Sequence, residues 1–141
     1  LQDEVLGSIN FDSLRLQMEI NAFAPLRVSE SLLPNLHRGS KIANITSRMG
    51  SISDNDSGGR YGYRASKAAL NALGRSLAID LKEQGIAVAQ LHPGYVKTRM
   101  VNFGGMITPE ESVAGLVRII ANLNLENTGS FWHSNGEELP W

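Results

Sequence analysis

The stretch "YGYRASKAALNALG" (residues 61–74) decides the fold, because it is a helical segment set between two short apolar segments. Its alanine, leucine and lysine residues favour a helix, and Gly85 supplies a stop just after Gln84. "SKIANITS" (40–47) precedes it and "IAVAQLH" (86–92) follows it, and both have the pattern of buried strands. A strand, a helix and a second strand predict a βαβ unit with a parallel sheet.

Two more helices are predicted on either side of this unit. Residues 11–36 are helical in composition, with Asn10 or Asp12 as the N-cap and Pro25 as an interruption. "TPEESVAGLVRII" (108–120) begins with a capping box. Its apolar residues recur at helical spacing and predict one stripe facing a core, made of Val113, Leu116, Val117 and Ile120.

Composition limits the class of protein. The chain has 141 residues with 42% hydrophobic residues and a net charge of -1, so we expect one ordered domain over residues 1–141 and no nucleic-acid partner. It has no cysteine, which excludes disulfides and thiolate metal sites and suits the cytoplasm. We expect no membrane partner, since no apolar run has the length of a membrane span. His92 and His133 lack metal-ligand spacing, so no metal site is predicted.

Candidate catalytic residues lie close to one predicted edge of the sheet. Tyr63 and Lys67 are four residues apart and share a helical face. An ammonium beside a phenol stabilises the phenolate, so we expect Lys67 to lower the pKa of Tyr63 and make it a proton donor to a carbonyl oxygen. Ser47 and Pro93-Gly94 follow the carboxyl ends of their strands, where open α/β sheets bind ligands. The Ser47 hydroxyl is suited to orienting a substrate oxygen.

Pro25 points to a fourth residue. Proline has no N–H, so the helical hydrogen bond from residue 25 to the carbonyl of Asn21 cannot form. A water molecule bound to the Asn21 carbonyl could then relay protons between Lys67 and solvent.

Each feature also has an ordinary interpretation. Ser47 could be a turn or cap residue, Pro25 could divide two helices, and Pro93-Gly94 could be a generic turn. A Tyr-x-x-x-Lys spacing alone is weak evidence. Their order along the chain and their convergence on one edge of one sheet favour the catalytic interpretation.

"YRASK" after "NITSRMG", followed by "HPGYVKT", resembles the catalytic half of the short-chain dehydrogenase/reductase family, and the likeness extends over nearly the whole chain. Within that family the chain is similar to the C-factor-like and carbonyl-reductase-like group. The resemblance implies Tyr63 as acid/base and Lys67 as its pKa modifier and ribose ligand. It also implies Ser47 as the substrate-carbonyl ligand and Asn21 as the holder of the relay water.

The resemblance further implies an NAD(P) cofactor, with NADP(H) favoured over NAD(H). The implied contacts to the nicotinamide and phosphates are Pro93, Gly94, Val96 and Thr98, beside Tyr63 and Lys67. The family's glycine-rich turn is absent from these 141 residues. We therefore expect the α/β C-terminal half of a doubly wound, parallel-sheet Rossmann fold (αβαβαβ), with the glycine-rich half before Leu1 and an exposed sheet edge.

Two functions remain open. The first is an NAD(P)-dependent oxidoreductase of a small carbonyl or alcohol substrate, with residues 99–108 as an apolar lid hinged at Gly104-Gly105. The second is a truncated, non-catalytic fragment that oligomerises or signals as C-factor-like proteins do. The resemblance implies a homodimer or homotetramer through the two long helices, where alanines allow close approach: Ala65, Ala68, Ala69 and Ala72.

Overall fold

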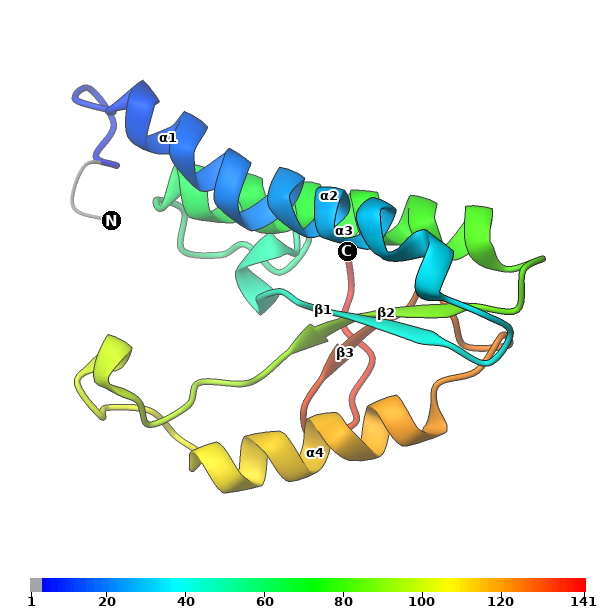
Figure 1. Cartoon of the computed structure of the whole chain (residues 1–141). Coiled ribbons are helices and arrows are strands. Elements are labelled where there is room, and N and C mark those ends of the chain that lie inside the picture. Colours follow the sequence, from blue (N-terminus) through cyan, green and yellow to red (C-terminus); the bar gives the residue numbers. More distant parts are fainter. Residues whose placement is uncertain (1–3) are drawn as a thin grey trace.

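Three parallel strands form the centre of the molecule in the computed structural model, which describes residues 4–141 (Figure 1). The strands are β1 (Lys41–Ile45), β2 (Ala87–His92) and β3 (Phe131–His133), in the spatial order β1-β2-β3. β1 pairs with β2 and β2 pairs with β3, both in parallel. Helix α3 (Tyr61–Leu81) connects β1 to β2, which confirms the predicted βαβ unit.

Helices cover both faces of this sheet (Figure 1). α1 (Phe11–Met18), α2 (Ala24–Leu32) and α3 lie on one face, and α4 (Pro109–Asn122) lies on the other. β2 is buried between them, so its side chains enter two apolar clusters in alternation. One cluster joins Val88 to the end of α3, and the other joins Ala87, Ala89 and Leu91 to α4 and Leu123.

The segment predicted as one interrupted helix contains a wider turn at its centre. Asn10 is the N-cap, because its side chain accepts from the backbone N–H groups of Asp12 and Ser13. Between α1 and α2, residues Glu19–Phe23 form a π-helical turn, and the N–H of Ala24 donates to the carbonyl of Glu19, five residues back. Pro25 cannot donate a backbone hydrogen bond, so the interruption predicted from it is located at this turn.

α3 ends at Leu81, three residues before the predicted boundary at Gln84. The chain leaves the helix through tight turns, with the N–H of Ile86 bonded to the carbonyl of Leu81 at 3.2 Å. Gly85 has a φ of +77°, the left-handed conformation that glycine adopts readily. The prediction that Gly85 stops this helical segment is therefore confirmed, although the glycine lies beyond the last helical turn.

α4 has the predicted start but a different buried face. Its capping box is confirmed, since Thr108 and Glu111 each accept from the other's backbone N–H. The predicted apolar stripe is wrong in part: Val113 and Val117 are 56% and 59% exposed. The backbone of Ser134 lies so close to Gly115 that a Cβ there would overlap it, and this contact turns Gly115 toward the sheet.

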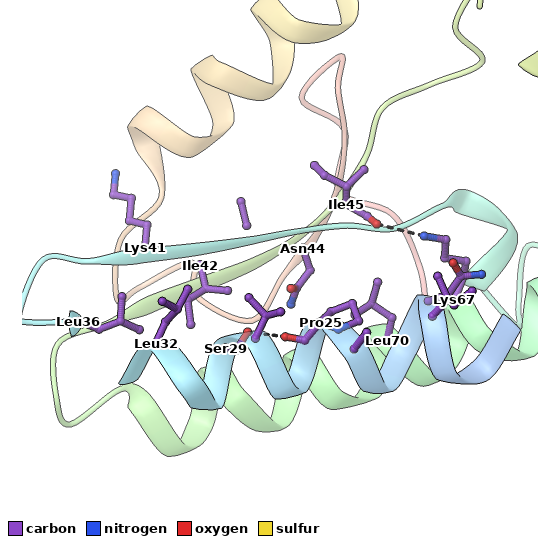
Figure 2. A pocket seen from close by; sticks show the side chains of 15 residues that line it. Pro25, Ser29, Leu32, Leu36, Lys41, Ile42, Asn44, Ile45, Lys67 and Leu70 are labelled. Atoms are coloured by element: carbon purple, nitrogen blue, oxygen red, sulfur yellow. Dashed lines mark hydrogen bonds between the residues drawn. The ribbon is translucent and has the colours of Figure 1, made fainter. Parts of the chain in front are cut away.

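The outer edge of β1 has no strand partner within residues 4–141. An apolar groove of about 630 Å³ runs between this edge and α2, as Figure 2 shows. Apolar side chains spaced four residues apart line its helical side: Ile20, Ala24, Val28 and Leu32. This is the exposed apolar edge that the sequence predicts.

Within residues 4–141, no helix is both long enough and apolar enough to traverse a lipid bilayer.

Candidate active site

The candidate residues come from segments that meet at the carboxyl edge of the sheet. Ser47 follows β1 and Pro93 follows β2, and the register pairs Ile45 with Leu91 at the ends of these strands. α3 begins at this same edge and carries Tyr63 and Lys67 in its first two turns (Figure 1). The topology therefore places the predicted residues around one edge, where α/β sheets bind ligands.

Lys67 lies between the Tyr63 ring and the end of β1. Its Nζ is 5.9 Å from the centre of the Tyr63 ring and donates a hydrogen bond of 3.1 Å to the carbonyl of Ile45 (Figure 2). Both side chains are half-buried. Burial lowers the pKa of Lys67, because desolvation disfavours the charged ammonium. The phenol and the ammonium thus share one small region, as their spacing predicts.

Ser47 is the cap residue of a short turn that packs on α3. It is 8% exposed, and its Oγ accepts from the N–H of Met49 at 3.2 Å, at the start of the turn Arg48–Gly50. Within residues 4–141 the hydroxyl hydrogen meets no acceptor, so it remains available for a ligand. A Cβ at Gly50 would lie 2.7 Å from the backbone carbon of Lys67, so this turn packs directly on α3.

Asn21 is tied to α3 through its side chain. Its Nδ2 donates to the Oγ of Ser66 at 3.1 Å, and Ser66, which is fully buried, donates to the carbonyl of Tyr63 at 2.9 Å. Asn21 and Lys67 both line the groove beside β1. The contact of the Asn21 side chain with Ser66 adds to the role that the sequence predicts for its carbonyl.

The segment after β2 presents backbone donors. Pro93 is fixed by its carbonyl, which accepts from Ser112 Oγ at 2.6 Å and from Ser134 Oγ at 3.0 Å. In the part of the chain that the structure describes, the N–H groups of Gly94, Val96 and Thr98 donate to no protein acceptor. Free backbone donors of this kind can bind carboxamide and phosphate oxygens, so the segment fits part of a nicotinamide dinucleotide.

The predicted lid carries exposed apolar side chains, and one of its glycines packs closely on the segment after β2. Met100, Phe103 and Met106 are 91%, 65% and 81% exposed. A Cβ at Gly105 would overlap the backbone of Val96 and Lys97, so this glycine allows close packing. The hinge at Gly104-Gly105 stays a prediction.

Two histidines at this edge were given no role in the sequence analysis. His92 and His133 end β2 and β3, and their rings meet edge to face with centres 4.9 Å apart. Burial lowers the pKa of His92 to about 4, the positive charges of His133 and Arg48 add to this, and Asp54 opposes it. The pKa of His133 is also lowered, first by burial. His92 ends a strand that the sequence predicts, but no strand was predicted at residues 131–133, so its pairing with His133 could not be anticipated.

Metal ligation has no support in the described part of the chain. Across residues 4–141, no three histidine, aspartate, glutamate or cysteine side chains gather as a metal ion would require.

The parallel sheet, the helices on both faces and the polar side chains at the carboxyl edge define an α/β protein with half of a doubly wound Rossmann fold. The family model for short chain dehydrogenases matches residues 2–104. The chain belongs to this short-chain dehydrogenase family.

Relatives with known names show how much of the family fold is present. The chain is 48% identical to 1-hydroxy-2-glutathionyl-2-methyl-3-butene dehydrogenase of Rhodococcus sp. (strain AD45), over 99% of this chain and 63% of that protein. It is 42% identical to C-signal of Myxococcus xanthus, over 96% of this chain and 83% of that protein. The chain therefore spans less than two thirds of the first of these relatives.

Solved structures agree with the family assignment. Carbonyl reductase Sniffer of D. melanogaster matches with a TM-score of 0.91 and 31% identity, over 98% of this chain and 61% of that one. The NADPH-bound carbonyl reductase from chicken fatty liver matches with a TM-score of 0.88 and 32% identity, over 99% of this chain and 61% of that one. The fold is the C-terminal half of the Rossmann fold of these proteins, as predicted.

Proposed function

We propose that this chain carries the catalytic residues of an NAD(P)-dependent oxidoreductase that interconverts a carbonyl compound and its alcohol. The observation that carries the proposal is the position of the Lys67 ammonium, 5.9 Å from the centre of the Tyr63 ring and bonded to the carbonyl at the end of β1. Family membership and the likeness to carbonyl reductases support the same reaction class.

In the proposed reaction, Tyr63 gives its hydroxyl proton to the substrate oxygen as negative charge develops there. The nearby Lys67 ammonium stabilises the phenolate that remains. The Ser47 hydroxyl donates to the same substrate oxygen and orients it. Asn21 holds a water molecule on its backbone carbonyl, through which Lys67 and Tyr63 regain a proton from solvent. In the reverse direction, Tyr63 acts as the base.

A bound nicotinamide dinucleotide would supply or accept the hydride. We assign its nicotinamide and nearby phosphate to the segment after β2, through Pro93, Gly94, Val96 and Thr98, whose free backbone donors suit these groups. Lys67 and Tyr63 would contact the ribose. The 141 residues contain no glycine-rich phosphate turn, so the rest of the cofactor would bind outside them. We favour NADP(H) because one structural relative is an NADPH-bound carbonyl reductase.

The proposed substrate is a small carbonyl or alcohol compound with an apolar part. Three exposed apolar side chains follow the proposed cofactor segment and could cover such a molecule: Met100, Phe103 and Met106. The similarity to a dehydrogenase of a glutathionyl-substituted alkenol and to two carbonyl reductases supports this class.

Replacing Tyr63 with phenylalanine in the full-length protein tests the reaction. We expect turnover of an aldehyde substrate to fall at least a thousandfold, while NADPH affinity, measured by fluorescence titration, stays within about threefold, because only the proton donor is lost. Tyr61, which lies in the same helix and is 39% exposed, provides the matched control. Tyr61→Phe should leave turnover within twofold, and substantial activity in Tyr63→Phe would refute the proposal.

A second function is favoured by one comparison. The chain covers 83% of C-signal, a larger share than it covers of the dehydrogenase. The alternative is therefore a non-catalytic protein that signals or oligomerises without turnover. Purified 1–141 chain that binds no NADPH by titration, yet associates with itself in analytical ultracentrifugation, would support this alternative.

Self-association through the two long helical segments remains part of both proposals. α3 presents small exposed residues, Ala65 and Ala72, and α1 presents Leu16, which is 59% exposed. Small residues allow close approach of helices, and apolar residues favour burial. We propose a homodimer or homotetramer built on this face. We keep the cytoplasm as the proposed location, because a cysteine-free chain suits a reducing compartment.

A further inference from the structure

The loop after Ser47 starts with a turn that packs on α3 and then continues without regular structure. Beyond the turn Arg48–Gly50, residues 51–60 form no helix or strand. Inside the loop, the N–H of Asp54 donates to Ser51 Oγ at 3.2 Å, and Arg48 Nε donates to Asp54 Oδ2 at 2.5 Å. The direction of the Arg48 side chain, next in the chain to Ser47, therefore depends on where residues 51–54 lie.

Trp141 provides an external anchor for this loop. Its main-chain oxygen accepts two hydrogen bonds from Ser53, one from the N–H at 3.1 Å and one from Oγ at 2.8 Å. The two residues are 88 positions apart, so the contact joins distant parts of the chain. Two donors from one residue on one acceptor hold that part of the loop in both distance and direction.

Trp141 is itself fixed to the sheet. Its ring stacks on that of Phe131 in β3, with centres 5.5 Å apart and planes 24° apart, and Phe131 is fully buried. The N–H of Leu139 donates to the carbonyl of Phe131 at 2.7 Å, and Leu139 is only 4% exposed. The segment that carries Trp141 thus packs along the outer strand, and the loop after Ser47 is linked through it to the core.

The anchored loop starts beside the end of β2, because the N–H of Thr46 donates to the carbonyl of Leu91 at 2.8 Å. The charges of Arg48 and Asp54 act on the ring of His92, where Arg48 lowers and Asp54 raises its pKa. The loop therefore contributes charged groups to the same carboxyl edge at which Ser47 and His92 lie.

We propose that Trp141 is a positioning residue of the active site: it holds Ser53, and through the loop 48–54 it sets the place of Ser47 and Arg48 beside the substrate. The inference rests on the proposed role of Ser47 in orienting the substrate oxygen. Small displacements of an orienting hydroxyl weaken transition-state binding strongly, so a residue that restricts the loop acts on catalysis without touching the substrate.

The test compares Trp141→Ala with Trp141→Phe in the full-length protein. Alanine removes the ring that stacks on Phe131, whereas phenylalanine keeps a stacked ring. In Trp141→Ala we expect amide hydrogen exchange in residues 48–54 to accelerate about tenfold, kcat/KM for an aldehyde to fall about tenfold, and NADPH affinity to stay within twofold. Trp141→Phe should restore both exchange and kcat/KM to within about threefold of wild type.

A second variant guards against general unfolding. Ser53→Ala removes one of the two hydrogen bonds from a loop position and should show the same changes, at about threefold. Val117→Ala, at a residue 59% exposed on α4, serves as the control and should change neither readout. Unaltered exchange in residues 48–54 of Trp141→Ala, or a loss of kcat/KM that phenylalanine does not restore, would overturn the inference. Accelerated exchange in a protein that reduces no carbonyl would instead refute the proposed function and leave the anchor standing.

Discussion

Asn21 and Ser66 join the π-helical turn to α3 through a hydrogen bond of 3.1 Å between Nδ2 and Oγ. Ser66 extends this link to Tyr63, because its hydroxyl donates to the carbonyl of Tyr63 in the same helix. π-turns inserted in helices are frequent at functional sites. Here the turn brings a residue of the first helical segment to the start of the helix that carries the proposed proton donor.

Replacing Pro25 with alanine should separate activity from stability. Alanine restores an N–H that can donate to the carbonyl of Asn21, so this carbonyl would no longer be open to the proposed relay water. We expect turnover to fall about tenfold, while the free energy of unfolding stays equal or rises by about 1 kcal/mol. Turnover by stopped-flow absorbance and urea unfolding measure the two effects.

Pro34→Ala is the matched control, because Pro34 lies in the separate turn Leu33–Asn35 at the end of α2. It should leave turnover within twofold. Full activity in Pro25→Ala would remove the Asn21 carbonyl from the proposed proton relay.

Replacing Lys67 with methionine should remove turnover and alter the pH dependence of stability. Burial lowers the pKa of Lys67 below 10.5, so between that lowered pKa and 10.5 the unfolded chain binds more protons than the folded one. The wild-type protein should therefore gain stability as pH rises through this window, and Lys67→Met should lack this gain. Urea unfolding between pH 7 and 11 measures the difference.

In the same variant, turnover should fall at least a hundredfold at every pH, because the phenolate of Tyr63 loses its neighbouring charge. Lys82→Met, at the exposed end of α3, is the control and should retain turnover. An active Lys67→Met protein with a wild-type pH profile would contradict the proposed role of the ammonium.

Replacing His92 with glutamine should reduce the sensitivity of the fold to acid. The pKa of His92 is lowered from 6.5 to about 4, mainly by burial, so the unfolded chain takes up this proton at a higher pH than the folded chain. Stability from this group is present above pH 6.5 and is lost as pH falls toward 4. We expect His92→Gln to lose about 2 kcal/mol less than wild type over this window.

His37→Gln, at an exposed histidine before β1, controls for the loss of an imidazole. Thermal unfolding at pH 7, 5.5 and 4.5 gives the comparison. Equal losses in His92→Gln and wild type would show that other groups govern the acid response.

Local features could be predicted because neighbouring residues encode them. The capping box of Thr108 and Glu111 lies within four residues, and the proximity of Tyr63 to Lys67 follows from helical spacing. β1 and β2 were recognisable because each is short, apolar and followed by turn residues.

Contacts between residues that are distant in the sequence could not be predicted from the sequence pattern. The hydrogen bond from Asn21 to Ser66 and the contact of Ser53 with Trp141 depend on how helices and loops pack around the sheet. The buried face of α4 was misplaced for the same reason, since the close approach of Gly115 to Ser134 sets its rotation. Hydrophobic periodicity identifies the apolar face of an isolated helix, but it does not show which other element packs on each turn.

Gly74 and Gln90 provide a test of packing beneath the site. Gln90 is fully buried in β2, its Oε1 accepts from Asn44 Nδ2 at 2.9 Å, and its side chain fills the space where a Cβ at Gly74 would lie. Gly74→Ala should therefore destabilise the protein by about 2 kcal/mol through overpacking, whereas Ser76→Ala, at an exposed position of the same helix, should change stability by less than about 0.5 kcal/mol.

The double variant makes this prediction specific to the pair. Gln90→Ala empties the space that the new methyl group of Gly74→Ala would occupy, so the two changes together should destabilise less than the sum of the single changes, by about 1 kcal/mol or more. Denaturant unfolding of the four proteins gives the coupling energy. Additive losses would mean that alanine at position 74 destabilises the protein through the backbone conformation. The buried amide of Gln90 would then not determine how closely α3 approaches β2.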